Sequence, residues 1–413
     1  MEEVWIIDHV RTPRGIGKVG KGALADLHPQ HLFATTLKAL KARNDIKTEE
    51  VDDVIVGCSS QVGKQGACVG RMGQLLAGWD YRGSGVTIDR FCGSSLSAVS
   101  LAAMGVAAGV NDVVVAGGVE MMSYTPNAPR MPGPPVIDGG NEALRRMYPT
   151  PNVGIAADLI ATLEGFTREE VDRLGYVSQV RAAEAIKAGR FDRSVVPVYK
   201  EDGSIALDHE EYPRPETTLE TLAALNPAFA KAYDAPLDEE GLTFRKLVEA
   251  TFPDVKLNHI HHAGNSSGVV DGASAVLLAS PQYARAQGWK PRAKVKMMAE
   301  HGDMPQLILN APVPAAKKAL RKAGMEIGDI DLFEVNEAFA VVPLKFMRDL
   351  DVSHDIVNVN GGACALGHPI GATGAMLLGT VIDELERRDL TTGLVTMCAF
   401  GGMAPCVIVE RVH

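Results

Sequence analysis

Two cysteines, a histidine and an asparagine stand where their side chains could do chemistry. Cys92 heads a long helical stretch without a charged residue, "GSSLSAVSLAAMGVAAG". Unpaired backbone N–H groups at a helix N-terminus favour a thiolate over a thiol, so Cys92 is a candidate nucleophile. A buried structural thiol is the alternative, because free cysteine is among the most buried residue types.

His368, Cys398 and Asn336 stand at comparable places farther along the chain. His368 lies in the Gly-rich turn "GGACALGHPIGATG" before a second small-residue helix, and Cys398 ends a core strand in "CAFGGMAP". Asn336 and Glu337 follow a strand in "EVNEAFA", where ligands collect in α/β sheets. Taken alone, each has an ordinary structural interpretation. Together they predict a base and a second thiol facing Cys92.

A duplicated α/β pattern would position these residues. "LKALKARNDIKTEEVDDVIVG" near the start and "KKALRKAGMEIGDIDLFEV" near residue 317 share a helix, a polar turn and a strand. The segment around Cys92 with the strand "NDVVVAGGVEMM" matches the segment around His368 with "LVTMCAFGGMA". Two α/β halves packed face to face would bury their central helices on all sides. We therefore predict an α/β fold of two duplicated halves with buried central helices.

An irregular region separates the two halves. From about residue 123 to 151, prolines and glycines prevent regular structure, and Thr167 and Glu170 then form a capping box before a helix. We predict three units: an N-terminal half at 1–122 and 257–283, an inserted loop or cap domain at 123–256, and a C-terminal half at 284–413.

Composition excludes several classes of protein. The chain has 413 residues, 46% of them hydrophobic, with a net charge of −10 that argues against general nucleic-acid binding. No apolar run approaches the roughly 18 residues of a membrane span. The six cysteines include no C-x-x-C pair, and the "HIHH" histidines lack a nearby carboxylate or thiol, so no metal site is predicted. The start "MEEVWIIDHVRTP" does not resemble a secretory signal, and we expect a cytoplasmic protein.

A series of motifs resembles the thiolase family along nearly the whole chain. They are "DHVRTPRG", "DRFCGSSL", "AGGVEMMS", "RPETTLETLAALNPAF", "AGNSSGVVDGASAVLL", "EVNEAFA", "GGACALGHPIGATG" and "CAFGGM". The resemblance implies the thiolase fold, layered α-β-α-β-α, with an inserted cap. It implies a CoA-dependent acyltransferase that cleaves 3-ketoacyl-CoA with CoA, or condenses acyl-CoA with acetyl-CoA, as in fatty-acid β-oxidation. CoA thioesters are then substrates, and no cofactor is bound permanently.

The resemblance also implies a role for each site residue. Cys92 falls on the acylated nucleophile, His368 on the base that activates it, and Cys398 on the second acid/base. Asn336 falls on the residue that holds the thioester oxygen through a water, and His368 completes that oxyanion site. The backbone N–H groups of Cys92 and Phe400 would hold a second oxyanion. Free CoA would attack acyl-Cys92, so the kinetics should be ping-pong.

Three departures from the family pattern bear on the substrate. Phe400 stands where C-x-G-G-G usually has glycine, so a side chain must fit beside the pocket. Segment 231–262 is longer than the usual link and lies by resemblance near the CoA entrance. Asn152 and Val153 stand where short acetyl-specific enzymes carry a His-Met pair. The third departure favours a substrate other than simple acetoacetyl-CoA, whereas Phe400 leaves the substrate preference and the oxyanion geometry open.

Binding residues and partners also follow from the resemblance. It places Ser267 of "AGNSSG" beside the pantetheine arm of CoA, while Ser94, Ser95 and Glu120 are interpreted as structural. Family members are commonly homo-oligomers, so we expect a homodimer or homotetramer with contacts at 123–151, and a hydratase/dehydrogenase partner stays open. Candidates for the CoA phosphates, with solvated surface charge as the alternative, are Arg214, Arg245 and Lys246.

Two other functions remain open. Phe400 makes conceivable a thiolase-fold subunit that binds acyl-CoA with weak or no turnover. A decarboxylating ketosynthase shares the cysteine and a GHP-like histidine, but Cys398 and Asn336 point away from it. The acyl chain length, the physiological direction and the pathway are left open by the sequence.

Overall fold

The computed structural model of the chain describes residues 2–127 and 136–412, which contain a 10-stranded mixed sheet. Its strands are β1 (Trp5–Arg11), β2 (Gly15–Ile16), β3 (Asp53–Gly57), β4 (Val86–Ile88), β5 (Val113–Met121), β8 (Val270–Ala279), β9 (Ala293–Gly302), β10 (Leu332–Val335), β11 (Thr392–Thr396) and β12 (Met403–Arg411). The order across the sheet is β10-β11-β12-β9-β1-β8-β5-β3-β4, and β2 pairs with β8.

The two halves of this sheet have the same topology. In the N-terminal half β3 is parallel to β5, β5 is antiparallel to β8, and β8 is antiparallel to β1. In the C-terminal half β10 is parallel to β11, β11 is antiparallel to β12, and β12 is antiparallel to β9. A 3-10 turn precedes the first strand of each series, at Thr48–Glu50 and at Ile327–Asp329. The duplication predicted from the sequence is therefore confirmed.

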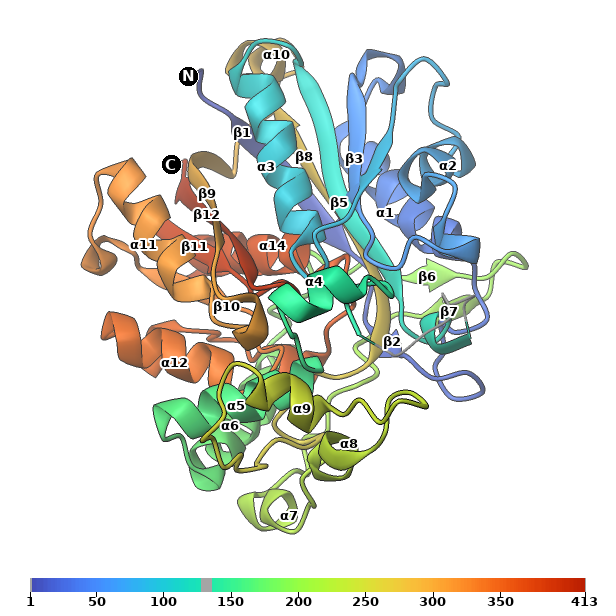
Figure 1. Ribbon diagram of the computed structural model, residues 1–413. Coiled ribbons are helices and arrows are strands. Elements are labelled where there is room, and N and C mark those ends of the chain that lie inside the picture. Colours follow the sequence, from blue (N-terminus) through green and yellow to red (C-terminus); the bar gives the residue numbers. More distant parts are fainter. Residues whose placement is uncertain (1, 128–135, 413) are drawn as a thin grey trace.

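Two central helices, α3 (Ser94–Ala107) and α14 (Thr373–Arg388), lie between the halves. α3 contacts β3 and β5, α14 contacts β10 and β11, and the helices contact each other (Figure 1). A Cβ on Gly374 would stand 2.6 Å from the backbone nitrogen of Leu96, so the helices cross at backbone distance. This close approach explains the small, uncharged residues of α3.

Further helices cover the outer faces of the two half-sheets. α1 (Pro29–Asn44) and α2 (Val69–Leu76) pack on the N-terminal half, and α11 (Pro312–Ala323) and α12 (Val341–Leu350) pack on the C-terminal half. The short helices α10 (Pro281–Ala286) and α13 (Ala363–Leu366) lie in connections. The predicted layer order α-β-α-β-α is confirmed. No helix among the described residues is long and apolar enough to cross a membrane.

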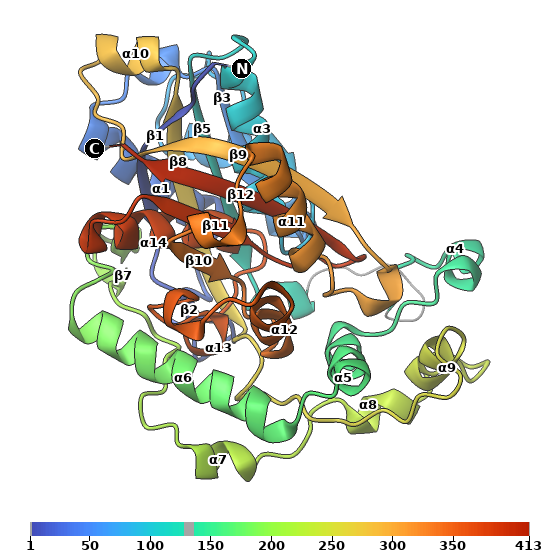
Figure 2. The same cartoon turned by 90° about the vertical axis from the view of Figure 1, so that its left-hand side faces the viewer.

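The elements of the segment between β5 and β8 are α4 (Glu142–Met147), α5 (Val153–Glu164), α6 (Arg168–Lys187), β6 (Val198–Tyr199), β7 (Ile205–Leu207), α7 (Leu219–Ala223), α8 (Ala230–Asp234) and α9 (Phe244–Glu249). Most of this segment, from α5 to α9, gathers at one end of the molecule, at the bottom of Figure 1, while α4 and the β6–β7 hairpin lie higher, at the sides of the sheet (Figures 1 and 2). The predicted capping box of Thr167 and Glu170 begins α6. Of the predicted irregular excursion at 123–151, residues 128–135 lie outside the described residues. The prediction that this stretch has no regular structure is wrong at Glu142–Met147, because Asn141 caps helix α4 there by accepting a hydrogen bond from the Leu144 N–H at 3.2 Å.

The long segment 231–262 folds against α5. Ile155 and Leu159 of α5 form an apolar cluster with side chains from the segment, namely Tyr233, Phe244, Leu247 and Val248. Asn152 caps α5, its side chain accepting a hydrogen bond from the Gly154 N–H at 2.9 Å. The additional length therefore adds a small packed layer to the cap.

Candidate active site

The carboxyl ends of β10 and β11 bring Asn336 and Cys398 to one edge of the sheet. These strands pair in parallel with Val335 opposite Thr396, and the Asn336 N–H donates to the Thr396 carbonyl at 3.1 Å. Both side chains are buried. This edge is where α/β sheets collect catalytic groups.

Cys92 follows a tight turn that leads into α3. Phe91 has φ +49°, in the left-handed region that residues with a Cβ seldom adopt. Its N–H donates to Asp89 at 2.6 Å, while the Ser94 hydroxyl donates to the Phe91 carbonyl at 2.6 Å and accepts from the Arg90 N–H. Such strained positions persist where surrounding contacts hold them, and they cluster at functional sites.

The surroundings of the Cys92 thiol favour its protonated form. Burial, followed by the nearby Glu120 carboxylate, raises the pKa of Cys92 to about 12. The backbone N–H groups of Cys92 and Phe400 act in the opposite direction but are outweighed. The prediction of a thiolate stabilised by the helix N-terminus is therefore wrong, because desolvation exceeds what these amides supply. A base is needed to activate Cys92.

His368 is a neutral imidazole between two polar side chains. Burial, with the Arg14 guanidinium as a second cause, lowers the pKa of His368 to about 3. Its Nδ1 lies 2.6 Å from the Thr373 hydroxyl oxygen, and its Nε2 lies 3.4 Å from Nδ2 of Asn336. Being neutral, the ring can accept a proton on one nitrogen.

Cys398 is a second protonated thiol close to Cys92. Burial and the proximity of Cys92 raise the pKa of Cys398 well above its usual value. The first turns of α3 and α14 are joined by a hydrogen bond from the Ala375 N–H to the Ser95 hydroxyl at 3.1 Å. This bond brings the turn of Cys92 and the turn of His368 to the same place. We call Cys92, Asn336, His368, Thr373 and Cys398 the catalytic junction.

Glu120 holds the two halves together beside this junction. Its buried carboxylate accepts hydrogen bonds from the Ser59 N–H at 2.9 Å and the Gln65 side chain at 2.8 Å, both in the N-terminal half. It also accepts from the Gly371 N–H at 2.9 Å, in the turn that follows His368. Because the pKa of Glu120 is raised by its burial, these donors are needed to hold it.

Phe400 fits the turn after β11 without left-handed strain. The positive φ angles fall on the next residues, Gly401 at +85° and Gly402 at +77°. The Phe400 ring lies 5.7 Å from the ring of Phe91, centre to centre. A side chain at this position thus leaves the Phe400 N–H near Cys92, where that N–H acts to lower the pKa of the Cys92 thiol.

The candidate residues for CoA lie in different surroundings. Arg245 donates to Asp234 at 2.9 Å, and Lys246 donates to the Gly241 carbonyl at 2.7 Å. Arg214 is exposed, with its guanidinium carbon 5.3 Å from the centre of the Tyr212 ring. It lines a cavity of about 270 Å³ together with Gln179, Tyr212, Glu216, Thr217, Thr221, Leu222, Leu225, Ala263, Gly264 and Cys364.

Ser267 stands between this cavity and His368. It follows the cavity residues Ala263 and Gly264 by a few positions, and its N–H donates to the Ala338 carbonyl at 3.0 Å. The carbonyl of the next residue, Gly268, accepts from the His368 N–H at 2.9 Å. Ser267 thus lies on the stretch of chain that links the Arg214 cavity to the backbone of His368.

The "HIHH" histidines are held by carboxylates that are distant in sequence. Nδ1 of His259 and Nδ1 of His261 each lie 2.8 Å from Asp158, and Nε2 of His262 lies 2.7 Å from Asp172. The interpretation that they lack a carboxylate partner is wrong, because α5 and α6 supply one. The described residues contain no group of three or more His, Cys, Asp or Glu side chains arranged to hold a metal ion.

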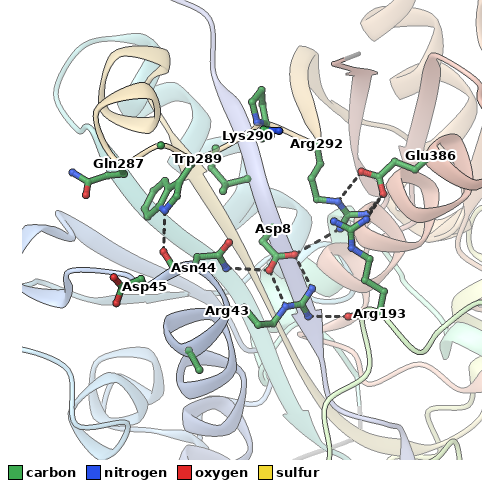
Figure 3. Close-up of a pocket in the computed structure, with 14 residues that line it drawn as sticks. Asp8, Arg43, Asn44, Asp45, Arg193, Gln287, Trp289, Lys290, Arg292 and Glu386 are labelled. Atoms are coloured by element: carbon green, nitrogen blue, oxygen red, sulfur yellow. Dashed lines mark hydrogen bonds and ion pairs between the residues drawn. The ribbon is translucent and has the colours of Figure 1, made fainter.

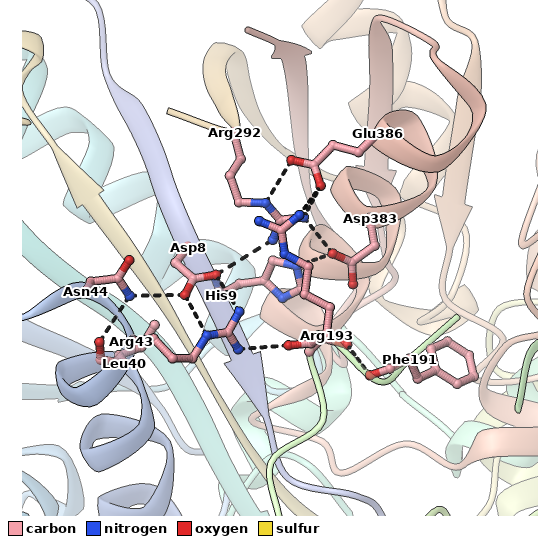
Figure 4. A network of polar contacts seen from close by, with 11 residues as sticks. Asp8, His9, Leu40, Arg43, Asn44, Phe191, Arg193, Arg292, Asp383 and Glu386 are labelled. Atoms are coloured by element: carbon pink, nitrogen blue, oxygen red, sulfur yellow. Dashed lines mark hydrogen bonds and ion pairs between the residues drawn. The ribbon is translucent and has the colours of Figure 1, made fainter. Parts of the chain in front are cut away.

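A larger cavity, about 660 Å³, lies at the other end of α14 (Figure 3). It is lined by the ends of α1 and α14 and by the connection from α10 to β9. Its charged side chains mainly bind one another or the neighbouring Asp383: Asp8 lies 3.0 Å from Arg43, and Arg292 lies 2.7 Å from Asp383 and 2.6 Å from Glu386 (Figure 4). We call these five residues the ion-pair junction; none of the predicted site residues belongs to it.

Two residues of the catalytic region, Thr373 and Phe91, were not predicted as functional from the sequence. Thr373 stands in the motif "GHPIGATG", and a hydroxyl in the first turn of a helix commonly reaches back to groups before it. That rule could have identified it. The left-handed turn at Phe91 has no such signal, because neither a glycine nor an asparagine marks it.

Comparison with known proteins places the chain in a class and a family. Residues 4–234 match the thiolase N-terminal domain and residues 289–411 match the thiolase C-terminal domain. A 3-ketoacyl-CoA thiolase of Colwellia psychrerythraea is 38% identical, with 100% of both chains covered. The steroid 3-ketoacyl-CoA thiolase FadA6 of Mycobacterium tuberculosis is 39% identical over 100% of this chain and 95% of its own.

A solved structure is similar to this chain over its whole length. The acetyl-CoA acetyltransferase of Bacillus anthracis has a TM-score of 0.83 and 32% identity, over 100% of this chain and 99% of its own. The duplicated five-layer fold and these matches define an acyltransferase whose substrates are CoA thioesters. The chain belongs to the thiolase family.

Proposed function

We propose that this thiolase works by a ping-pong mechanism through an acyl-Cys92 intermediate, cleaving a 3-ketoacyl-CoA with CoA or running the reverse Claisen condensation. One observation carries the proposal: the first turns of α3 and α14, joined by the Ala375–Ser95 hydrogen bond, stand next to two pairs of groups, His368 with Asn336 and Cys398 with Cys92. These groups come from the carboxyl edge of the sheet and from the turns that lead into the two central helices. Acyl transfer with carbon–carbon bond cleavage needs these groups, a nucleophile, a base and an acid.

In the first half-reaction Cys92 becomes acylated. Its S–H proton moves to His368, and the sulfur attacks the keto carbon of the substrate. The developing oxyanion is held by the backbone N–H groups of Cys92 and Phe400, both of which lie near the Cys92 sulfur. When the carbon–carbon bond breaks, the departing acetyl-CoA enolate takes its proton from Cys398.

In the second half-reaction free CoA releases the acyl group. Once the proton that His368 took from Cys92 has passed to the Cys398 thiolate, the thiol of CoA gives its proton to the neutral His368 and attacks the acyl-Cys92 thioester. The Cys92 thiolate then leaves and takes this proton from His368, so that all three groups return to their starting states. Asn336 serves the thioester oxygen of the CoA substrate through a water. Its Oδ1 has no hydrogen-bond partner within the described part of the chain, which leaves the amide free to orient such a water.

CoA binds along the path from the Arg214 cavity to His368. Arg214 meets the anionic end of CoA, and Ser267 lies beside the pantetheine arm. The exposed guanidinium of Arg214 supports this assignment, whereas Arg245 and Lys246 are engaged with partners of their own. No metal and no permanently bound cofactor takes part.

The acyl group differs from simple acetoacetyl. The Phe91 and Phe400 rings lie 5.7 Å apart, centre to centre, and Phe91 precedes Cys92 in the chain, so we assign this ring pair to the wall of the acyl pocket. The relatives include a 3-ketoacyl-CoA thiolase and a steroid 3-ketoacyl-CoA thiolase, so one fold serves acyl groups of different size.

The enzyme is a cytoplasmic homodimer or homotetramer with units at 1–122 plus 257–283, 123–256 and 284–413. Exposed Leu101 and Met104 on α3, and Val86 on the edge strand β4, support association between copies. Segment 123–151 contributes to the contact, and a hydratase/dehydrogenase partner stays open. The six cysteines are all free, which suits a reducing compartment.

A thiolysis assay tests this function. Loss of the enolate absorbance is followed for acetoacetyl-CoA and for a longer 3-ketoacyl-CoA after CoA is added. We expect turnover of both, with a higher kcat/KM for the longer substrate and parallel lines in double-reciprocal plots. Binding of acyl-CoA without turnover would favour the alternative, an acyl-CoA-binding subunit.

A further inference from the structure

We propose that Thr373 is a positioning residue that keeps the His368 proton on Nδ1 and so leaves Nε2 free as the base. The inference rests on the proposed role of His368. It extends that role by assigning the group that selects the working tautomer of the imidazole.

The hydrogen bonds of Thr373 determine the direction of its contact with His368. Its Oγ1 donates to the carbonyl of Pro369, one helical turn back, at 2.9 Å. The hydroxyl has one hydrogen, so toward Nδ1 of His368, 2.6 Å away, the oxygen acts as acceptor. Nδ1 must then carry the ring proton. Thr373 is 1% exposed, so no solvent competes for this bond.

The other ring nitrogen faces a donor. Nδ2 of Asn336 lies 3.4 Å from Nε2 of His368. An amide N–H that points at Nε2 requires a lone pair on Nε2. It would clash with a hydrogen on Nε2, because two donors would then face each other. Both neighbours of the imidazole therefore favour the same tautomer, the one whose free lone pair can take the proton of Cys92.

A hydroxyl suits both protonation states of the base. When the S–H bond of Cys92 breaks and an N–H bond forms at Nε2, His368 becomes an imidazolium with a proton on each nitrogen. Thr373 continues to accept from Nδ1 without moving. A carboxylate in its place would hold the imidazolium far more strongly and raise the pKa of His368, whereas the neutral hydroxyl leaves that pKa low.

The position of Thr373 is set by both halves of the fold. It is the first residue of α14, whose next turn is bonded to α3 through Ala375 and Ser95 at 3.1 Å. Two residues before it, the Gly371 N–H donates to Glu120 of the N-terminal half at 2.9 Å. The Thr373 hydroxyl oxygen, which accepts the Nδ1 proton of His368, is thus fixed relative to the turn that carries Cys92.

The experiment compares Thr373→Val with a matched change on the same helix. Thr380 is also buried in α14, and its hydroxyl makes the same back-bond, to Met376 at 2.9 Å, without touching a histidine. Thr380→Val is the control. Thr373→Ser keeps the hydroxyl. Thr373→Ala removes the hydroxyl, as Thr373→Val does, but without introducing a β-branched apolar side chain. The readouts are kcat, KM, the rate of Cys92 alkylation by iodoacetamide, and the melting temperature.

We expect Thr373→Val and Thr373→Ala to lower kcat and the alkylation rate by about 10- to 100-fold, the effect of leaving a buried donor unpaired. KM should stay within about twofold. Thr373→Ser and Thr380→Val should keep both rates within about threefold. Equal losses in Thr373→Val and Thr380→Val, or full rates in Thr373→Val, would overturn the inference. Full activity in His368→Gln would instead overturn the proposed base, and the inference with it.

Discussion

The two ends of α14 have opposite chemistry. At its N-terminal end the catalytic junction holds a neutral imidazole and two thiols that keep their protons. At its C-terminal end the ion-pair junction holds full charges, with Arg292 within 3 Å of both Asp383 and Glu386 (Figure 4). A helix of 16 residues spans about 24 Å, so the two junctions do not share contacts.

The two junctions differ in the charge state of their buried groups. Although burial alone would raise the pKa of Asp383, His9 and Arg292 hold that pKa well below its usual value. A carboxylate fixed in this way exchanges no proton near neutral pH and serves to join the halves. At the catalytic junction burial keeps the groups uncharged, so a proton can pass between neighbours at low cost. One junction is suited to stability and the other to reaction.

The largest expected effect comes from removing the nucleophile. Cys92→Ser should lower kcat by at least about three decades, because nucleophile and base act as a unit. It should also abolish stoichiometric labelling by iodoacetamide near neutral pH. Cys68→Ser is the control, since Cys68 is also free and partly exposed, and its thiol contacts the Gly85 carbonyl and the Thr87 hydroxyl instead of a residue of the junction. Persistent activity with labelling at another cysteine would show that the assignment of Cys92 is wrong.

The second change separates the two thiols of the junction. Cys398→Ala should leave Cys92 able to accept an acyl group from an activated thioester. It should lower Claisen condensation by about 10²- to 10⁴-fold, because the acid/base for the α-proton is lost. The two half-reactions are measured separately. If both fall equally, Cys398 has a structural role.

The third change breaks the ion-pair junction. Arg292→Met should lower the free energy of unfolding by about 3–5 kcal/mol, since it leaves Asp383 and Glu386 with less compensation in a buried setting. Denaturant unfolding measures this, and kcat per folded enzyme should change less than about twofold. Lys290→Met, at an exposed cation on the same cavity, should cost less than about 0.5 kcal/mol. A large loss of kcat in Arg292→Met would contradict the separation of the two junctions.

The same junction should respond to acid. The folded-state pKa of Asp383 lies below its unfolded value of about 3.9, so its stabilising contribution is present above that pH and is lost as the pH falls toward the folded pKa. The stability difference between the wild type and Asp383→Asn should therefore shrink below about pH 4. A difference that is constant from pH 7 to pH 3 would contradict this.

The smallest effect is expected at Phe400. Because its backbone is not in the left-handed region, Phe400→Gly should restore no displaced donor, and kcat for the best substrate should stay within about tenfold. Removing the ring beside Phe91 should change the preference among 3-ketoacyl chain lengths. Chain-length series for both enzymes measure this. An unchanged profile would mean that Phe400 does not face the acyl group.

The repeated fold was predictable because its signals are local. Small-residue helices, D-apolar strands and Gly-rich turns recur in order, and each reflects packing that α3 and α14 require. The four site residues could be proposed because each ends or begins such an element. The capping box at Thr167 was also readable, since its two partners are three residues apart.

The protonation states could not be predicted in this way. The helix-end position of Cys92 suggested a thiolate, but the Glu120 carboxylate and the dense packing that keep the thiol protonated come from other parts of the chain. The carboxylate partners of His259 and His262 lie about a hundred residues away in sequence, on α5 and α6. Spacing along the chain carries no signal for such contacts, because tertiary packing alone brings them together.

The central claim is that a neutral His368 takes the proton of Cys92, and the pH dependence of Cys92 alkylation tests it most directly. With the pKa of His368 at about 3 and that of Cys92 at about 12, the imidazole stays neutral and the thiol stays protonated at every pH between these two values. The iodoacetamide rate should therefore be flat from about pH 5 to pH 8 in the wild type. In His368→Gln it should be lower and should rise about tenfold per pH unit, following the free thiolate. The same steep rise in both enzymes would contradict the account.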